Sequence, residues 1–175
     1  MTYRDSDYIS TLGAAFTARR LQRLADAFVD DIEAFLRAQG LQVPGRAVST
    51  LLLIKQSPGL AITQVARQVQ MSHPLIINLL SNLEQLRLVE FRHDENDRRR
   101  RLIFLTEMGQ DEAVKLSAAL PVIRAAYAEL GREAGVDLSG IADRLDSALE
   151  RRSFRQRLDG VADIRALLAE GAPEN

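Results

Sequence analysis

Between residues 72 and 106, the spacing of the apolar residues changes from the period of an α-helix to that of a β-strand. Apolar residues at steps of three and four define one face of a helix predicted for residues 72–87: Ile76, Leu79, Leu80, Leu83 and Leu86. Two short alternating segments follow, "LVEFRH" and "RRLIFL", on either side of the turn-rich "DEND". The segment therefore predicts a long helix followed by a β-hairpin.

The chain before and after this segment is predicted to be helical. Helices are expected over residues 5–39 and 44–55, then over "TQVARQV", with Thr63 as its N-cap. Ser72 is expected to cap the next helix, with Pro74 in its first turn, and Thr106 to cap the helix after the hairpin. That helix contains Pro121, and a last one begins near residue 139. The predicted fold is mainly α with a small β wing: a winged helix-turn-helix flanked by long N- and C-terminal helices.

The outer face of the predicted helix over 72–87 carries no acid before Glu84. It presents small or hydrogen-bonding groups and one apolar side chain: His73, Pro74, Ile77, Asn78, Ser81 and Asn82. In a chain with 27% charged residues, a merely solvated face should be charged, so this face is predicted to meet a partner. Burial against another helix is the alternative, and His73 fits equally well as a first-turn residue without a contact.

The predicted hairpin has a tip rich in charges of both signs. Asp94, Glu95 and Asp97 are followed by four consecutive arginines at 98–101. In a winged helix-turn-helix the second helix enters the DNA major groove, and a basic wing reaches the adjacent minor groove. Pairing of Asp97 with Arg99 would orient the guanidinium and reduce its entropy loss, which is on the order of 2 kcal/mol for a whole arginine side chain. A solvated charged hairpin is the alternative.

The sequence therefore nominates a set of DNA-binding residues on the helix and the wing. Asn78 is suited to adenine, Ile77 and Pro74 to a thymine methyl, and His73 and Ser81 to base edges or phosphates. The full candidate set is Ser72, His73, Pro74, Ile77, Asn78, Ser81, Arg92, Asp97, Arg98, Arg99 and Arg100.

Composition narrows the other function classes. The chain has no cysteine and only two histidines, so thiolate chemistry is excluded and neither a metal site nor a cofactor is expected. No nucleophile–base pair or phosphate loop is visible, which argues against an enzyme. The pI near 6.2 excludes indiscriminate coating of nucleic acid, and 23 − 2 = 21 of the basic residues are arginine, a bias that a GC-rich genome also produces. Without a spanning segment or an apolar leader, the protein is expected to be cytoplasmic and away from membranes.

Residues 45–115 resemble the multiple antibiotic resistance regulator (MarR) family. The family's wing signature, Asp-x-Arg, a strand and Leu-Thr-x-x-Gly, is matched by Asp97, Arg98, Arg99, Leu105, Thr106 and Gly109. "LEQLRLVE" resembles the family's Leu-Glu-x-x-Gly-Leu-Val run. Gln70 and Arg87 replace common glycines, so these two turns are expected either to be strained or to adopt a positive φ. The recognition helix also lacks the usual Arg or Lys at its start.

The resemblance implies a homodimeric DNA-binding transcriptional regulator, commonly a repressor, that a small, often aromatic or anionic, ligand releases from DNA. Its parts would be a dimerisation helix at 5–39, a winged helix-turn-helix at 44–105 and dimerisation helices at 106–170, within one domain. A wide apolar stripe on the first helix supports the dimer, which predicts a pseudo-palindromic site with half-sites roughly 34–36 Å apart. A winged-helix module for protein–protein assembly, without DNA binding, is the alternative. The basic cluster at 151–157 is interpreted as a solvated face or an intersubunit ion-pair site, with phosphate contact the alternative.

Overall fold

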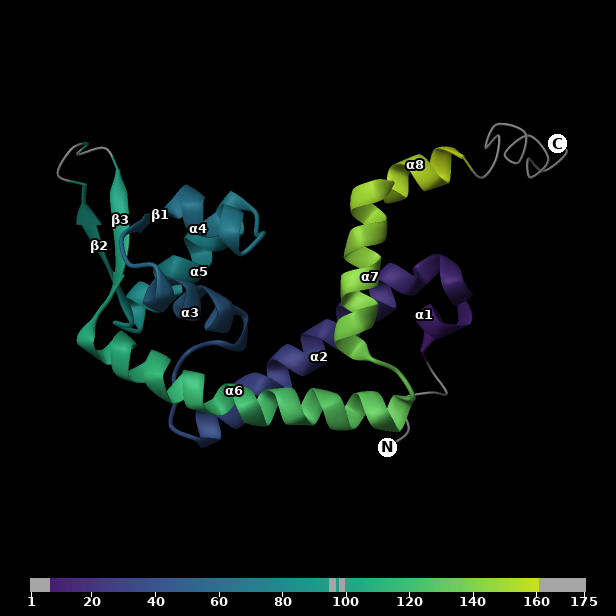
Figure 1. Cartoon of the computed structure of the whole chain (residues 1–175), viewed down its shortest axis with the longest axis horizontal. Coiled ribbons are helices and arrows are strands. Elements are labelled where there is room, and N and C mark those ends of the chain that lie inside the picture. The colour runs from purple at the N-terminus through teal and green to yellow at the C-terminus, as the bar shows by residue number, and fades with distance from the viewer. Residues whose placement is uncertain (1–6, 95–96, 98–99, 161–175) are drawn as a thin grey trace, which may run out of the picture. The chain divides into compact units, whose positions relative to one another are not determined.

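The computed structural model describes residues 7–94, 97 and 100–160 (Figure 1). Its elements, in chain order, are α1 (Tyr8–Thr11), η1 (Gly13–Phe16), α2 (Thr17–Ala38), η2 (Gly45–Ala47), α3 (Val48–Gln56), β1 (Leu60–Ala61), α4 (Ile62–Gln68), α5 (His73–Gln85), β2 (Val89–His93), β3 (Arg101–Leu105), α6 (Glu107–Ala134), α7 (Leu138–Arg151) and α8 (Phe154–Asp159). The predicted fold class, mainly α with a small β wing, is confirmed. The chain forms two compact units, residues 1–121 and 122–175, and the boundary falls at Pro121 within α6.

The predicted continuous helix over 5–39 is wrong, because the described part of it is divided into α1, η1 and α2. Gly13 has φ +64°, a left-handed conformation that ends a helix and that only glycine adopts without cost. The other end of α2 is where the sequence predicts it. There Gly40 has φ +78°, and the Leu41 N–H donates to the Leu36 carbonyl at 3.0 Å, as in a helix stop of the Schellman type.

The hydrophobic core lies in the first unit, among α3, α4, α5, the sheet and the adjoining ends of α2 and α6. Ile76, Leu80 and Leu83 of α5 are fully buried in it, each contributing about 2 kcal/mol from burial. Leu79 and Leu86 pack against the core while partly exposed. The apolar face predicted for this helix is confirmed, and it fixes which face of α5 is left to solvent.

Both turns that flank α5 use the left-handed conformation at residues other than glycine. Gln70 has φ 54° and Arg87 has φ 57°, so positive φ is the alternative that the structure adopts. The next residue closes each turn: the Met71 N–H donates to the Ala66 carbonyl at 3.0 Å, and the Leu88 N–H to the Leu83 carbonyl at 2.9 Å. These turns hold α4, α5 and β2 in sequence, and α5 ends at Gln85 rather than at the predicted Arg87.

Two of the predicted N-caps differ from the structure. The helix predicted to begin at Thr63 begins at Ile62, and its first turn is closed by the Ala61 N–H, which donates to Gln64 Oε1 at 2.8 Å. Ser72 does precede α5 in an extended conformation, with Pro74 in the first turn, but its side chain makes no capping hydrogen bond. A Pro in this turn removes a backbone donor, so less is gained from a cap.

The sheet contains three antiparallel strands in the order β1–β3–β2. The predicted hairpin is β2–β3, with Val89 opposite Leu105 and His93 opposite Arg101. The short β1, which the sequence analysis did not predict, pairs only with Ile103 and Leu102. The wing is therefore three-stranded at its base and two-stranded beyond Leu102, beside α3, α4 and α5 (Figure 1).

The start of α6 is fastened to the turn after α5. Thr106 is the predicted N-cap: its hydroxyl accepts from the Gly109 N–H at 3.0 Å and donates to the Arg87 carbonyl at 2.5 Å. A Cβ on Gly109 would lie 1.8 Å from the Leu88 carbonyl oxygen, so only glycine fits there. One turn later the buried Glu112 accepts hydrogen bonds from the backbone N–H groups of Gln42 and Val43, which ties the loop before η2 to α6.

The second unit contains the remainder of α6, then α7 and α8. Asp137 caps α7 by accepting from the Gly140 N–H at 3.0 Å, so the last predicted helix begins at Leu138 and ends at Arg151. Neither α7 nor α8 has a buried residue. Among the described residues, no helix is both long enough and apolar enough to cross a membrane.

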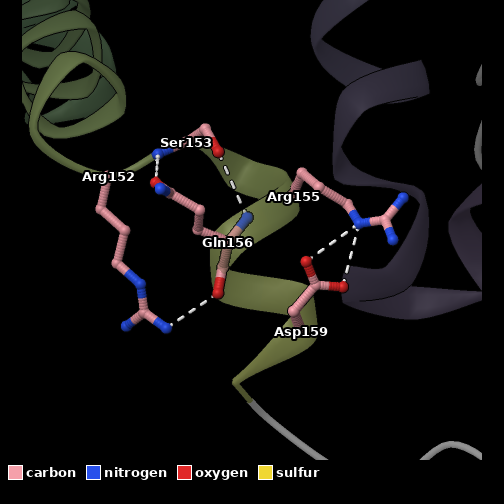
Figure 2. A network of polar contacts seen from close by, with 5 residues as sticks. All are labelled: Arg152, Ser153, Arg155, Gln156 and Asp159. Carbon is pink, nitrogen blue, oxygen red and sulfur yellow. Dashed lines mark hydrogen bonds and ion pairs between the residues drawn. The ribbon is translucent and has the colours of Figure 1, made fainter.

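Arginines of the 151–157 cluster fasten the corner between α7 and α8. Arg157 donates to the Ala148 carbonyl at 2.8 Å, and Arg152 donates to the Gln156 carbonyl at 2.9 Å. Figure 2 shows Arg152, the Ser153–Gln156 capping pair and the ion pair of Arg155 with Asp159, in which Arg155 Nε lies 2.9 Å from Oδ1. Guanidinium groups that satisfy carbonyls at helix ends have a structural role within the chain.

Candidate nucleic-acid interface

The outward face of α5 is exposed and uncharged over its first turns. His73, Pro74, Ile77 and Ser81 are all exposed, and 40% of the surface of Ile77 is accessible. The first acid on this helix is Glu84, near its C-terminal end. Since Ile76, Leu80 and Leu83 anchor the opposite side in the core, this face has a fixed direction. In general, an α-helix fits into the major groove of DNA, so an exposed and uncharged helix face of this kind is a candidate nucleic-acid contact.

Asn78 lies on a different side of α5 from Ile77. Together with Leu75, Leu79 and Asn82 it lines a cavity of about 250 Å³ between α5, α2 and η2. Helical geometry places residues 75, 78, 79 and 82 on one flank and residues 74, 77 and 81 on the other. A base contact by Asn78 remains a prediction, and the structure adds that its side chain also faces this cavity.

The tip of the wing is closed by backbone hydrogen bonds. The Arg100 N–H donates to the Asp97 carbonyl at 2.8 Å, and the Asp94 N–H donates to the Arg100 carbonyl at 3.0 Å. Arg100 is exposed, and its guanidinium lies 3.7 Å from the Asp94 carboxylate. Arg98 and Arg99, and with them the expected pair between Asp97 and Arg99, lie outside the described residues. The tip thus carries at least one exposed cation, Arg100, beside the Asp94 carboxylate.

Two arginines further down the wing lie over aromatic rings. The Arg92 guanidinium is 4.5 Å from the ring centre of Phe104 on the opposite strand, and its Nε donates to Glu90 at 2.7 Å. On the other face of the hairpin, the Arg101 guanidinium is 4.2 Å from the ring centre of Phe91. An exposed stack of this kind contributes about 0.5–1 kcal/mol. The stacks span the place where the third strand, β1, ends at Leu102, so they stiffen the hairpin at the start of its two-stranded part.

Sequence reasoning missed the contact between the wing and α5. The Arg101 guanidinium lies 3.8 Å from the Glu84 carboxylate, so it connects strand β3 of the wing to the last turns of α5. The clue in the sequence was the alternation of the strand, which puts Arg101 on the same face as Phe91. The nomination of Arg92 as a DNA contact remains untested, and in the structure its charge is already paired with Glu90.

Two carboxylates of α2 and of the segment before α1, Asp26 and Asp7, have a lowered pKa. Next to the cavity, hydrogen bonds from Arg46 at 2.5 Å and from Gln22 at 3.0 Å lower the pKa of Asp26 below its ordinary value. The pKa of Asp7 is also below its ordinary value, because the Asp7 carboxylate accepts hydrogen bonds from Ser10 and Arg23, each at 2.6 Å. Within the described residues, no group of three His, Asp or Glu side chains is arranged to hold a metal ion.

A comparison with protein families finds a match in the centre of this chain. Residues 40–100, which contain α3, α4, α5, β1 and β2, match the model of the MarR family. This segment, about a third of the chain, is similar to that family. A search of curated proteins found no match for the chain.

Solved structures of several transcriptional regulators share the fold at low sequence identity. The transcriptional repressor CouR bound to a 23-mer DNA duplex is 22% identical, with a TM-score of 0.57 over 77% of this chain and 90% of that one. PcaV from Streptomyces coelicolor in complex with its natural ligand is 21% identical, with a TM-score of 0.58 over 82% and 94%. A MarR-family regulator from Rhodococcus sp. RHA1 is 23% identical, with a TM-score of 0.51 over 77% and 91%. The fold thus extends beyond the segment that matches the MarR model.

Proposed function

We propose that this protein is a transcriptional regulator that binds a specific double-stranded DNA site. In this proposal α5 enters the major groove through His73, Pro74, Ile77 and Ser81, and the arginine-bearing tip of the wing enters the adjacent minor groove. We further propose that the bound protein represses transcription. The CouR repressor, whose DNA-bound form has this fold, supports that part of the proposal.

The observation that carries the proposal is the uncharged, exposed and rigidly mounted outer face of α5. Three fully buried residues, Ile76, Leu80 and Leu83, hold this face outward. The wing that leaves the same core ends in exposed Arg100. A neutral face that can read bases, beside a cationic tip that can contact phosphates, is the combination that specific DNA binding needs.

Homodimerisation is part of the proposal, and exposed apolar surface on the flanking helices supports it. On α2, Leu21 is 52% exposed and Leu24 is 50% exposed, although both belong to the predicted apolar stripe. On α7 and α8, Leu145, Leu149, Phe154 and Leu158 are also exposed. Apolar side chains at such density on a free surface mark an interface. Residues 161–170, the last part of the predicted dimerisation helices, lie outside the described residues.

We also propose a small-molecule effector, bound in the cavity between α2, η2 and α5. PcaV, which has this fold, has been solved with its natural ligand, and that supports ligand control here. An occupant of the cavity would touch Asn78 and Leu75 on the helix that is proposed to read DNA. Binding to the free form more tightly than to the DNA-bound form would release the operator.

Selection of bound duplexes from a random pool tests the proposal directly. We expect a pseudo-palindromic consensus, bound with strong salt dependence. Ile77→Ala should relax discrimination at one base pair of each half-site, because it removes an apolar contact to a base edge. Arg99→Ala should instead weaken binding to all duplexes and reduce the salt dependence.

The selection also separates this function from the protein–protein assembly module. An assembly module would enrich no consensus, and its residual binding would be insensitive to Ile77→Ala. Loss of sequence discrimination in the unmodified protein would therefore refute specific DNA binding, whatever its affinity for DNA in general.

A further inference from the structure

We propose that the cavity between α2, η2 and α5 takes a small organic cation with an apolar body, and that Asp30 selects the charge. The inference rests on the proposed function, since it names the chemical class of the effector. It is opposite in sign to the anionic ligands that resemblance to the family suggests.

The cavity has the size and the walls for a single-ring compound. Its volume of about 250 Å³ lies below the roughly 300–1,000 Å³ that is usual for drug-sized ligands. Half of its lining is apolar: Val29, Pro44, Ala47, Leu75 and Leu79. An aromatic or aliphatic body would be removed from water by these side chains, which accounts for affinity without deciding charge.

Most of the charged groups around the cavity already have partners. Arg46, the one cation in the lining, donates to Asp26 at 2.5 Å. Glu33 accepts from the Gly45 N–H at 2.9 Å and from Arg37 at 2.7 Å. Across the part of the chain that the structure describes, no hydrogen bond or ion pair involves the Asp30 carboxylate. The charge left over at the cavity is therefore negative.

The opposite wall presents groups that suit a hydrogen-bond donor. Asn78 and Asn82 come from α5, facing Asp30 on α2, and neither amide is hydrogen-bonded within residues 7–94. A cationic head with several N–H groups can donate to the Asp30 carboxylate and to an Asn carbonyl at once. A carboxylate in the same place would be repelled by Asp30, and Arg46 would have to leave Asp26 to pair with it.

Three nearly isosteric compounds test the charge selection: benzamidinium, benzamide and benzoate. Titration of each into the DNA-free protein, followed by calorimetry or by amide chemical shifts, gives three affinities. We expect benzamidinium to bind most tightly and benzoate most weakly. Equal affinities, tighter binding of benzoate, or no binding by any of the three would overturn the proposal.

Two aspartate variants form a matched pair. Asp30→Asn should weaken benzamidinium about threefold to tenfold, because it removes a charge-assisted but partly screened contact, and should leave benzamide nearly unchanged. Asp31→Asn removes the same charge from the neighbouring position, which is exposed like Asp30 but lies outside the lining, so benzamidinium affinity should change little. Equal losses in the two variants would mean that only the general charge of α2 matters, which contradicts the proposal.

A space-filling change locates the bound ring. Leu75 is 48% exposed and lines the cavity, so Leu75→Trp adds volume there without disturbing the core. This variant should abolish benzamidinium binding while the thermal midpoint stays close to that of the parent. Undiminished binding would place the ligand elsewhere and overturn the proposal.

Binding of ligand and of DNA are measured separately, so the two proposals can fail independently. Fluorescence anisotropy with the selected duplex reports DNA binding before any compound is added. A protein that binds benzamidinium but no duplex retains the inference about the cavity and refutes the proposed function. A protein that binds its duplex but prefers benzoate retains the proposed function and refutes the inference about the cavity.

Discussion

At the scale of single residues, the junction between α5, β2 and α6 allows little variation. Thr106 and Gly109 both contact the backbone of the turn at Arg87 and Leu88. This contact gives a physical reason for the spacing of Leu-Thr-x-x-Gly: the threonine caps α6, and the glycine leaves room for the Leu88 carbonyl. The direction in which α6 leaves the winged helix depends on these two residues.

We expect Gly109→Ala to destabilise the first unit by at least about 2 kcal/mol, because the new Cβ would lie 1.8 Å from the Leu88 carbonyl oxygen. In an ordinary helix the same change is stabilising, so its sign is diagnostic. Urea unfolding measures the effect, and an unchanged or higher midpoint would contradict the close approach.

Arg87→Gly should raise the free energy of unfolding by about 0.5–1 kcal/mol, since φ 57° costs a residue with a Cβ but not glycine. Arg67→Gly provides the control, because Arg67 is exposed and in the regular part of α4, where glycine should destabilise. Changes of the same sign in both variants would refute the explanation from backbone strain.

At the scale of elements, the structure of the wing changes along its length. Where β1 pairs with Leu102 and Ile103 it is a three-stranded sheet, and beyond Leu102 it is a two-stranded ribbon, which is only marginally stable by itself. The stacks of Arg92 on Phe104 and of Arg101 on Phe91 cover the two faces of the hairpin around the place where β1 ends. These arginines of the strands therefore stabilise the wing, and in the proposed function the arginines of the tip contact DNA.

Salt dependence of DNA binding distinguishes these two groups of arginines. Arg100→Ala should reduce the slope of log K against log salt by about one, as expected for a lost phosphate contact. Arg92→Leu keeps an apolar contact with Phe104 and removes a charge already paired with Glu90, so the slope should change by less than half as much. Arg124→Ala, on α6 outside the wing, serves as the control. If Arg92→Leu also reduced the slope by about one, Arg92 would be a DNA contact, as the sequence analysis predicts.

The ion pair of Asp26 on α2 with Arg46 on η2 should make the stability of the first unit depend on pH. Arg46 and Gln22 lower the pKa of Asp26 in the folded chain below its ordinary value of 3.8. The stability from this ionised carboxylate is therefore fully present above about pH 4 and is lost as pH falls through the lowered pKa. Asp26→Asn should show a smaller loss of stability between pH 5 and pH 3 than the parent protein. The free energy of unfolding in urea, measured at each pH, gives the comparison. An equal loss of stability in the variant and in the parent protein would exclude a contribution from Asp26.

At the scale of the whole molecule, the second unit has little interior of its own. Among its described residues only Gly131 is buried, while α7 and α8 expose several large apolar side chains. A segment of this kind requires a partner surface to be stable. The proposed homodimer supplies this partner surface. It would also bring two copies of α5 into one molecule.

Light scattering should give about twice the 19.5 kDa mass of one chain. Leu145→Glu and Leu149→Glu together should shift the protein toward monomer, because they place charge on exposed apolar positions of α7. The same double variant should bind a single half-site as before but lose the preference for paired half-sites. A monomeric parent protein would leave the palindromic operator without a basis.

The sequence by itself determined the elements with strong local signals. The apolar stripe of α5, the two strands of the wing, the cap at Thr106, the place of Pro74 in the first turn of α5, and the unusual turns at Gln70 and Arg87 all depend on neighbours within a few residues. These signals are sufficient for the winged-helix class and for the face of α5 that is exposed.

Tertiary structure decided what depends on residues far apart in the chain. The strand β1 and the cavity shared by Asp30 and Asn78 have no local signature, and for Arg101 the strand alternation indicates the face but not its partner Glu84. Asn78 illustrates the reason: its position on a helical wheel follows from sequence, but the neighbour on that side is α2, tens of residues earlier. Periodicity specifies which way a side chain points, and only packing specifies what it meets there.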